Sequence, residues 1–364
     1  LFRSQRGDAV TKKLYRAAPV LIAEGQGDGE SDGNPWGIRF SAMFHMSADS
    51  GLFRDTPAPA GEPPRLPLYE AKMVHQFDHR WATYIDAPEK PNGLDTEDAS
   101  AAQKADPAFT VRPRYWVQER QVLARIARVP SRVANAWLAW HEATPGATQQ
   151  NAEDVVQLVL AGWVAGALFR QAVDASTPAA PASASLWEAH ASPMPPASQG
   201  WTNQQRQNGL LATEHALAQR YPSFSRTLKA AYPTSIQLLG ALTKWAQQDD
   251  PAQGLFLSDA ELTELQALQQ PVATAENAIE SGATSACQIS AMGQFDLSFM
   301  DAWMDRRSPR WLMGYRRITN ATNERTCLAT VLPRVAAGDS VFLMTLGNRQ
   351  CDLVAALLAN LVCF

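Results

Sequence analysis

The spacing of apolar residues predicts strands near the C-terminal end of the chain. An apolar and aromatic run that begins at Trp311 is followed by a polar Asn/Thr segment and by a second apolar run, residues 327–332. Two such runs joined by turn-forming residues predict a strand, a turn and a strand. Residues 340–346 predict one more strand, and the apolar pattern from Cys351 onward predicts a helix.

The middle of the chain, residues 131–295, has a helical pattern. Its stretch AEDVVQLVLAGWVAGALFRQA is apolar nearly all round, which predicts a buried core helix. A Pro/Ala/Ser-rich segment, residues 174–200, has the composition of a linker. Further helices are predicted over 203–220, 223–248 and 258–270.

The N-terminal third mixes both patterns. Alternation at Ile38, Phe40 and Ala42 predicts a half-buried strand. Aromatic and Met residues recur every four positions in the stretch 66–84, which predicts a helix with one apolar face: Tyr69, Met73, Phe77 and Trp81. Polar residues 86–110 predict a loop, and a helix is expected from about Val117.

Strands near both ends and helices between them predict an α+β fold. We expect three parts: residues 1–130, a helical block at 131–295 that could be an insertion, and residues 296–364. The chain starts at Leu1 within a basic run and stops at Phe364 within a helix-like pattern, so we expect it to be an internal fragment of a longer protein.

Composition excludes some classes of function. The chain has 364 residues, of which 46% are hydrophobic and 19% charged, and its net charge of −4 gives no overall basic field for nucleic acid. The four cysteines are far apart and form no C-x-x-C pair, which argues against a zinc site or a disulfide framework and indicates a reducing cytoplasm. The sequence has no run of eighteen apolar residues, and we expect no signal peptide.

Positive charge is instead concentrated in two windows. The window 111–129 holds five arginines beside Tyr115 and Trp116, and the window 306–325 holds six arginines against the single acid Glu324. Arginine is the usual partner of DNA phosphates and of guanine edges, and asparagine pairs with adenine edges. Both windows are therefore candidates for DNA contact, although a helix or hairpin with a solvated arginine face has the same pattern.

Three alternatives remain open at this stage. Glu70 and Lys72 have the Glu-x-Lys spacing of Mg²⁺-dependent nucleases, for which Asp49 could supply the second carboxylate. His75 and His79 have the i, i+4 spacing of metal ligands on a helix, but no third ligand is evident. The helical block could also dock a partner subunit.

Three stretches together give a more specific indication. LPLYEAKMVHQFDHRWATY, RPRYWV and GYRRITNATNERTCLATVLPR, in this order, resemble the adenine-specific DNA methyltransferases of type IIG restriction–modification enzymes and of BREX- and DISARM-like phage-defence systems. NPWGIRFSAMFHMSADSGLF is similar to the segment that precedes them in the same family. The resemblance covers residues 1–130 and 296–364.

The resemblance implies that methyl transfer and target recognition are carried out by different parts of the protein. In that family an upstream Rossmann-like domain binds S-adenosyl-L-methionine, and an Asn-Pro-Pro-aromatic motif holds the extruded adenine. Neither that motif nor a glycine-rich cofactor loop occurs here, so the resemblance places this chain downstream, at the start of the region that recognises the DNA target. It implies double-stranded DNA as a partner, defence-system subunits as further partners, and no cofactor or catalytic residue within the chain.

The residues expected to contact DNA lie in three stretches. They are Lys72, His75, Arg80, Arg112, Arg114, Arg316, Arg317, Thr319, Asn320, Asn323, Arg325 and Thr326.

Overall fold

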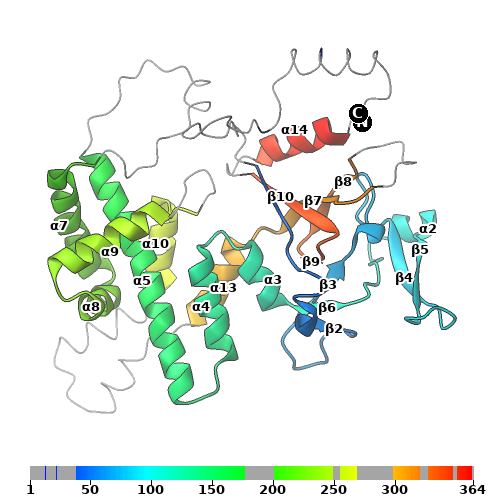
Figure 1. Cartoon of the computed structure of the whole chain (residues 1–364), viewed down its shortest axis with the longest axis horizontal. Helices are drawn as coiled ribbons and strands as arrows, with labels where there is room; N and C mark the ends of the chain where they lie inside the picture. Colours follow the sequence, from blue (N-terminus) through cyan, green and yellow to red (C-terminus); the bar gives the residue numbers. More distant parts are fainter. Residues whose placement is uncertain are drawn as a thin grey trace.

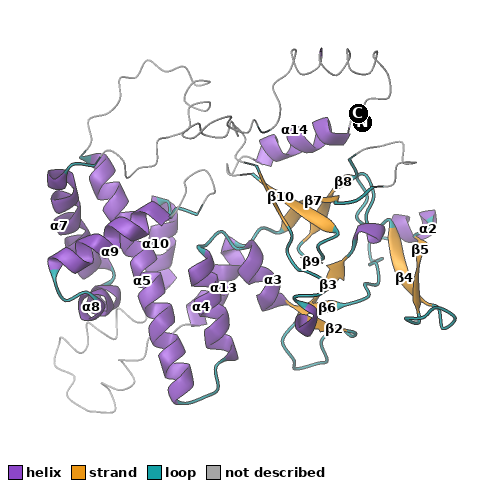
Figure 2. Ribbon diagram, in the orientation of Figure 1, coloured by secondary structure: helices purple, strands orange, loops and turns teal. Residues whose placement is uncertain are grey.

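A helical block and a group of small sheets lie side by side in the computed structural model of the chain (Figure 1). Apart from the single residues Lys13 and Ile22, the structure describes residues 38–176, 201–248, 255–268, 298–319, 327–346 and 351–362. The predicted α+β class is confirmed, with strands near both ends and helices between them (Figure 2).

The first sheet joins the two ends of the chain. Its strand order is β1 (Arg39–Ser41), β10 (Val341–Thr345), β7 (Trp311–Arg316) and β8 (Ala329–Pro333), and all neighbours are antiparallel. Strands β7 and β8 are the predicted hairpin. The 1–130 and 296–364 segments therefore contribute strands to the same sheet.

The described residues also form two further sheets. One has the order β2 (Phe53–Arg54), β6 (Trp116–Gln118), β3 (Arg65–Tyr69) and β9 (Ala336–Ala337), where β3 and β9 are parallel. The other pairs β4 (Ala82–Asp86) with β5 (Leu94–Asp98). Short helical turns connect these strands: η1 (Ser50–Leu52), η2 (Ala71–Met73) and α2 (Ala101–Ala105).

The helical block is organised around the long helix α5 (Ala147–Ala175). The helices α4 (Ser131–Glu142), α7 (Asn203–Arg220), α8 (Pro222–Ala231) and α9 (Ser235–Gln248) pack against it. The two helices that lead into the sheets, α3 (Glu119–Ile126) and α13 (Ser298–Arg307), and α10 (Asp259–Leu268) also contribute to the core of this block.

Helix α5 has the burial expected of a core helix. Among the described helices it alone is long and apolar enough to cross a membrane, but 61% of its most apolar window is buried inside the protein. Gly162 and Gly166 allow the side chain of Trp245 on α9 to approach closely, since an added Cβ at Gly162 would lie 2.2 Å from its ring. The packing against α9 is compatible with a soluble protein.

The sheets have their own cores. Leu312, Leu332 and Leu343 face one side of the first sheet, with the second sheet's Val117 and Leu68 in the same cluster. On the other side of the first sheet, Met313 and Met344 pack with Leu357 of α14 (Cys351–Val362), which is the helix predicted from Cys351 (Figure 2).

The structure corrects four predictions. Residues 66–84 do not form a helix but most of β3, the turn η2, a loop and the start of β4. Residues 86–110 are not a plain loop, because they contain β5 and α2. Residues 223–248 form two helices, separated at Pro233, a residue that cannot continue a helix. Strand β1 is present, but Phe40 is 42% exposed and not half-buried as its alternation indicated.

Candidate nucleic-acid interface

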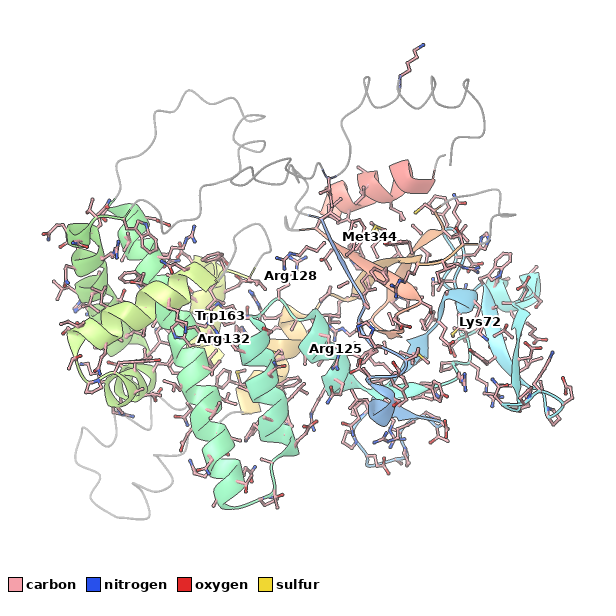
Figure 3. The ribbon with its side chains drawn as sticks, viewed as in Figure 1. Lys72, Arg125, Arg128, Arg132, Trp163 and Met344 are labelled. Atoms are coloured by element: carbon pink, nitrogen blue, oxygen red, sulfur yellow. The ribbon has the colours of Figure 1, made fainter. Side chains whose placement is uncertain are left out.

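The two basic windows of the sequence meet around one open groove of about 1040 Å³. It lies where the first sheet faces α3 and α13, and we call it the arginine groove. Figure 3 shows Arg125 and Arg128 on the helical side of this region and Met344 on the sheet side. Its described lining includes one acid, Glu261, and six arginines: Arg39, Arg125, Arg128, Arg306, Arg307 and Arg310.

A buried ion pair builds the floor of the groove. Arg307 is 7% exposed and forms an ion pair with Glu261 of α10. Its Nε also donates to the carbonyl oxygen of Arg128 at 2.7 Å, and the backbone amide of Arg128 donates back to the carbonyl oxygen of Arg307 at 3.0 Å. These bonds join the end of α3 to the end of α13, which holds the two basic windows together.

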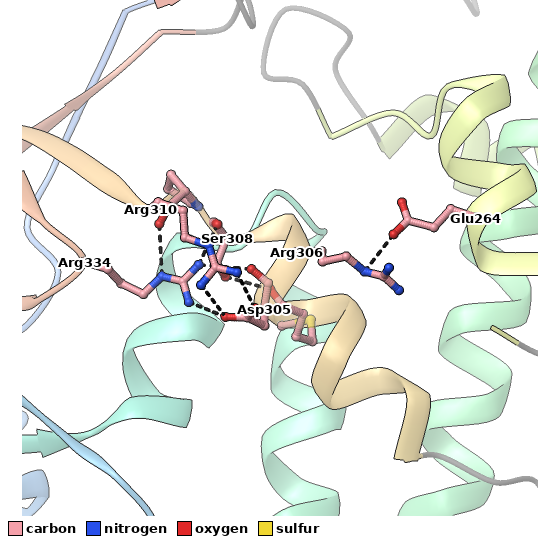
Figure 4. Close-up of polar contacts among 8 residues, drawn as sticks. Glu264, Asp305, Arg306, Ser308, Arg310 and Arg334 are labelled. Carbon is pink, nitrogen blue, oxygen red and sulfur yellow. Dashed lines mark hydrogen bonds and ion pairs between the residues drawn. The ribbon is translucent and has the colours of Figure 1, made fainter. Parts of the chain in front are cut away.

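Asp305 orders the arginines on the rim (Figure 4). Arg310 donates to its carboxylate at 2.7 Å, and Arg334 forms an ion pair with the same carboxylate. Burial works to raise the pKa of Asp305, but the hydrogen bonds and charges of Arg334 and Arg310 outweigh it and lower the pKa. Arg306 pairs with Glu264 at 2.7 Å (Figure 4).

Positive charge exceeds negative charge along the described lining of the groove, where six arginines meet the single acid Glu261. Ion pairs join Arg125 to Asp49, Arg306 to Glu264, and both Arg310 and Arg334 to Asp305. Arg39 is exposed and has no carboxylate partner within the described ranges. Two exposed aromatic side chains, Phe40 and Trp311, also line the groove.

Sequence reasoning identified the groove only in part. It singled out five of the six arginines as members of two basic windows, but nothing in their spacing showed that these windows meet. Arg39 was missed because it lies outside both basic windows, between the alternating apolar residues Ile38 and Phe40. Its position on β1, next to the strand β10 that follows the second window, could not be found without the sheet order.

Two of the residues expected to contact DNA, His75 and Arg316, lie outside the arginine groove, at the far end of the β7–β8 hairpin. Arg316 at the end of β7 donates from Nε to the carbonyl oxygen of Val74 at 2.7 Å. The charge of Arg316 also acts on His75, whose pKa is lowered mainly by burial and next by this guanidinium. The structure therefore brings His75 and Arg316 together, although 241 positions separate them in the sequence.

The remaining hairpin residues are partly described. Arg317 is exposed, with its guanidinium 4.9 Å from the ring centre of Phe342, and Thr319 is half-buried. Four expected contact residues lie outside the described residues: Asn320, Asn323, Arg325 and Thr326. Lys72 lies away from the arginine groove (Figure 3), 4.7 Å above the ring of Tyr84.

Arg80 has a structural role. Its guanidinium donates to the backbone carbonyls of Lys104 at 2.8 Å, Asp106 at 3.0 Å and Phe109 at 3.3 Å. All these acceptors belong to the segment after β5, so Arg80 fastens that segment to the loop before β4. The sequence predicted a phosphate contact for Arg80, and nothing in it indicated these bonds to the backbone.

Arg112 and Arg114 line a different cavity, of about 510 Å³, with Asn92 and Trp116. Arg112 forms an exposed ion pair with Asp86 at 2.9 Å. This cavity shares no lining residue with the arginine groove.

The carboxylates of the nuclease alternative are engaged in structural contacts. Asp49 accepts from the backbone amide of His45 at 2.7 Å and pairs with Arg125 at 3.2 Å. Glu70 accepts from the hydroxyl of Tyr84 at 2.7 Å. Within the described ranges, no three His, Cys, Asp or Glu side chains form a group that could hold a metal ion, and His75 stacks on Trp81 at 4.3 Å.

Comparison of the chain with protein-family models, with curated proteins and with solved structures gave no match.

Proposed function

We propose that this chain is the DNA-binding, target-recognition part of an S-adenosyl-L-methionine-dependent, site-specific adenine-N6 DNA methyltransferase. The observation that carries the proposal is the arginine groove, where six arginines and one glutamate are the charged residues of the described lining, on a chain of net charge −4. The resemblance of the stretches 66–84 and 314–334 to this methyltransferase family supports the choice of reaction.

The positive charge of the arginine groove is complementary to the phosphate backbone of DNA. Each guanidinium presents donors that match phosphate oxygens, and neutralised phosphates release counterions, so binding is favourable and sensitive to salt. Arg39 and Arg310 are exposed at the groove, whereas Arg307 is buried and maintains its shape. The groove would thus position the duplex, while base-edge readout would come from the hairpin end, where Arg316 and Arg317 lie.

Methyl transfer is assigned to another portion of the parent protein. The chain has no Asn-Pro-Pro-aromatic motif and no glycine-rich cofactor loop, so S-adenosyl-L-methionine would bind upstream. The parent enzyme would act in the cytoplasm, in restriction–modification or phage defence, where further subunits of a defence system are expected partners.

Binding to labelled mixed-sequence duplex, followed by fluorescence anisotropy, tests the proposal. The wild-type chain is expected to bind, and the charge-reversed variant Arg39→Glu/Arg310→Glu is expected to lose most of its affinity. Arg220→Glu, on the exposed surface of α7, is the matched control and should bind as the wild type does. Wild-type binding that neither variant changes would remove the groove from the interface.

Selection from a random duplex library tests target recognition itself. The pool retained by the chain should become enriched in one motif that contains an adenine, and the chain incubated with labelled S-adenosyl-L-methionine should transfer no methyl group. A retained pool with no sequence preference would contradict the recognition role, and methyl transfer would contradict the assignment of catalysis to another portion.

A further inference from the structure

An aromatic side chain occupies the tip of a tight turn at the hairpin end. The backbone amide of His75 donates to the carbonyl oxygen of Asp78 at 2.7 Å, and the amide of Asp78 donates back to His75 at 3.0 Å. These reciprocal bonds define a two-residue turn with Gln76 and Phe77 at its tip. We call residues 75–78 the Phe77 turn.

Phe77 has an unfavourable conformation for its residue type. Its φ is 61°, and it is the only described residue other than glycine with a positive φ. The third position of a turn that needs positive φ favours glycine or asparagine, and a bulky residue there is a strained outlier. Burial of the side chain offsets little of this backbone strain, because Phe77 is 61% exposed. Backbone strain of this kind occurs most often at functional sites, such as ligand-binding positions.

The turn is held rigidly in place. The backbone amide of Phe77 donates to the carbonyl oxygen of Ala329, on the free edge of β8, at 3.0 Å. Lys104 pairs with Asp78 at 2.7 Å, and Arg316 donates to the carbonyl of Val74 just before the turn. The ring is therefore presented on a preorganised support, which limits the ordering cost of binding.

The surroundings of the ring indicate the kind of ligand. Arg316 lies at the base of the turn and exposed Arg317 follows it on the hairpin, beside Ile318, which is 81% exposed. An exposed apolar tip with a guanidinium at its base matches a ligand that combines anionic groups with flat apolar surfaces, which is the structure of a nucleic acid. A protein partner would be expected to cover a wider apolar area than these two side chains offer.

We propose that Phe77 is a wedge that inserts between neighbouring base pairs of bound duplex DNA and unstacks them. This inference rests on the proposed function. Apolar side chains that enter a base step separate the bases and kink the duplex, and neighbouring cations hold the phosphates on either side. The rigid turn and the positive φ fix the direction in which the ring projects.

Duplex DNA that carries 2-aminopurine at several adenine positions tests the wedge, because this base fluoresces weakly when stacked and brightly when unstacked. Anisotropy of a second dye on the same duplex reports binding independently. At saturation the wild-type chain should raise the 2-aminopurine fluorescence. Phe77→Ala should lose most of this increase while it still binds, and Phe77→Trp should restore it.

Leu211→Ala is the matched control, since Leu211 is 66% exposed on α7 in the helical block. It should leave both signals unchanged. Thermal unfolding of each variant verifies that it is folded. Saturated binding with equal fluorescence for wild type and Phe77→Ala would overturn the wedge alone and leave Phe77 as a protein contact. Absence of duplex binding by the wild-type chain would overturn the proposed function and, with it, the wedge.

Discussion

The backbone amide of Phe77 donates to the carbonyl oxygen of Ala329 at 3.0 Å, across 252 positions of sequence. This bond fastens the Phe77 turn to the edge of the β7–β8 hairpin. The strain of the turn and the placement of the hairpin are therefore linked, and the stability of the turn can be tested without any ligand.

Glycine should suit position 77 better than alanine. A residue with a Cβ at a φ of 61° carries strain of roughly 1–2 kcal/mol, which exceeds the entropic cost of glycine. Phe77→Gly should be more stable than Phe77→Ala by about 0.5–1 kcal/mol in urea unfolding. The same pair at Leu211, inside helix α7, should show the opposite order by about 1 kcal/mol. If alanine is the more stable residue at both positions, the turn is not strained.

Arg307 should matter for stability far more than its neighbour Arg310. Arg307→Met removes the buried cation from its ion pair with Glu261, whose side chain is only 14% exposed, so we expect a loss of about 3–5 kcal/mol in the free energy of unfolding. Arg310→Met removes an ion pair whose arginine side chain is 70% exposed and should cost less than about 1 kcal/mol. Chemical unfolding of the two variants compares them directly, and equal effects would contradict the buried role of Arg307.

The close contact between α5 and α9 requires a residue without a side chain at position 162, which is glycine. Gly162→Ala would place a Cβ 2.2 Å from the ring of Trp245, and we expect a loss of about 1–3 kcal/mol from this overpacking. Gly240, on α9, has nothing within 4 Å of the position of an added Cβ, so Gly240→Ala should stabilise the helix by about 0.5–1 kcal/mol. Thermal unfolding should shift in opposite directions for the two variants; a shift in the same direction would refute the close approach.

Two histidines should make the fold sensitive to acid. Burial, and then nearby arginines, lower the pKa of both His75 and His79 in the folded chain. The unfolded chain therefore binds more protons as the pH falls through the unfolded value of about 6.5, and the folded state loses stability below that pH. Urea midpoints between about pH 7.5 and pH 5.5 should fall less for His75→Gln/His79→Gln than for the wild type. His215→Gln, on exposed α7, should follow the wild type. An undiminished fall in the double variant would exclude these histidines as the cause.

The sequence predicted those elements whose pattern is local. The β7–β8 hairpin has two apolar runs with a polar segment between them, and the central part of α5 is apolar nearly all round, so both were found. The stretch 66–84 was misread because its aromatic residues recur every four positions. Its strand β3 is instead fixed by β6 and β9, and β9 lies more than 260 positions away. No local pattern can report that pairing.

For the candidate interface, the sequence predicted only which segments are rich in positive charge. The two basic windows could be recognised along the chain, but their meeting depends on the bonds of Arg307 to Glu261 and to the backbone of Arg128. Phe77 was assigned to an apolar helix face, whereas it lies at a turn tip, because a positive φ leaves no signature when the residue is not glycine or asparagine.

The dependence of duplex binding on salt tests the central claim most directly. If the arginine groove neutralises phosphates, the affinity of the wild-type chain should fall steeply with salt, and Arg39→Gln/Arg128→Gln/Arg310→Gln should reduce the slope of log K against log salt by about 0.9 for each phosphate that the variant no longer neutralises. Arg220→Gln should keep the wild-type slope. A slope that is the same for all three proteins would show that the groove does not hold DNA.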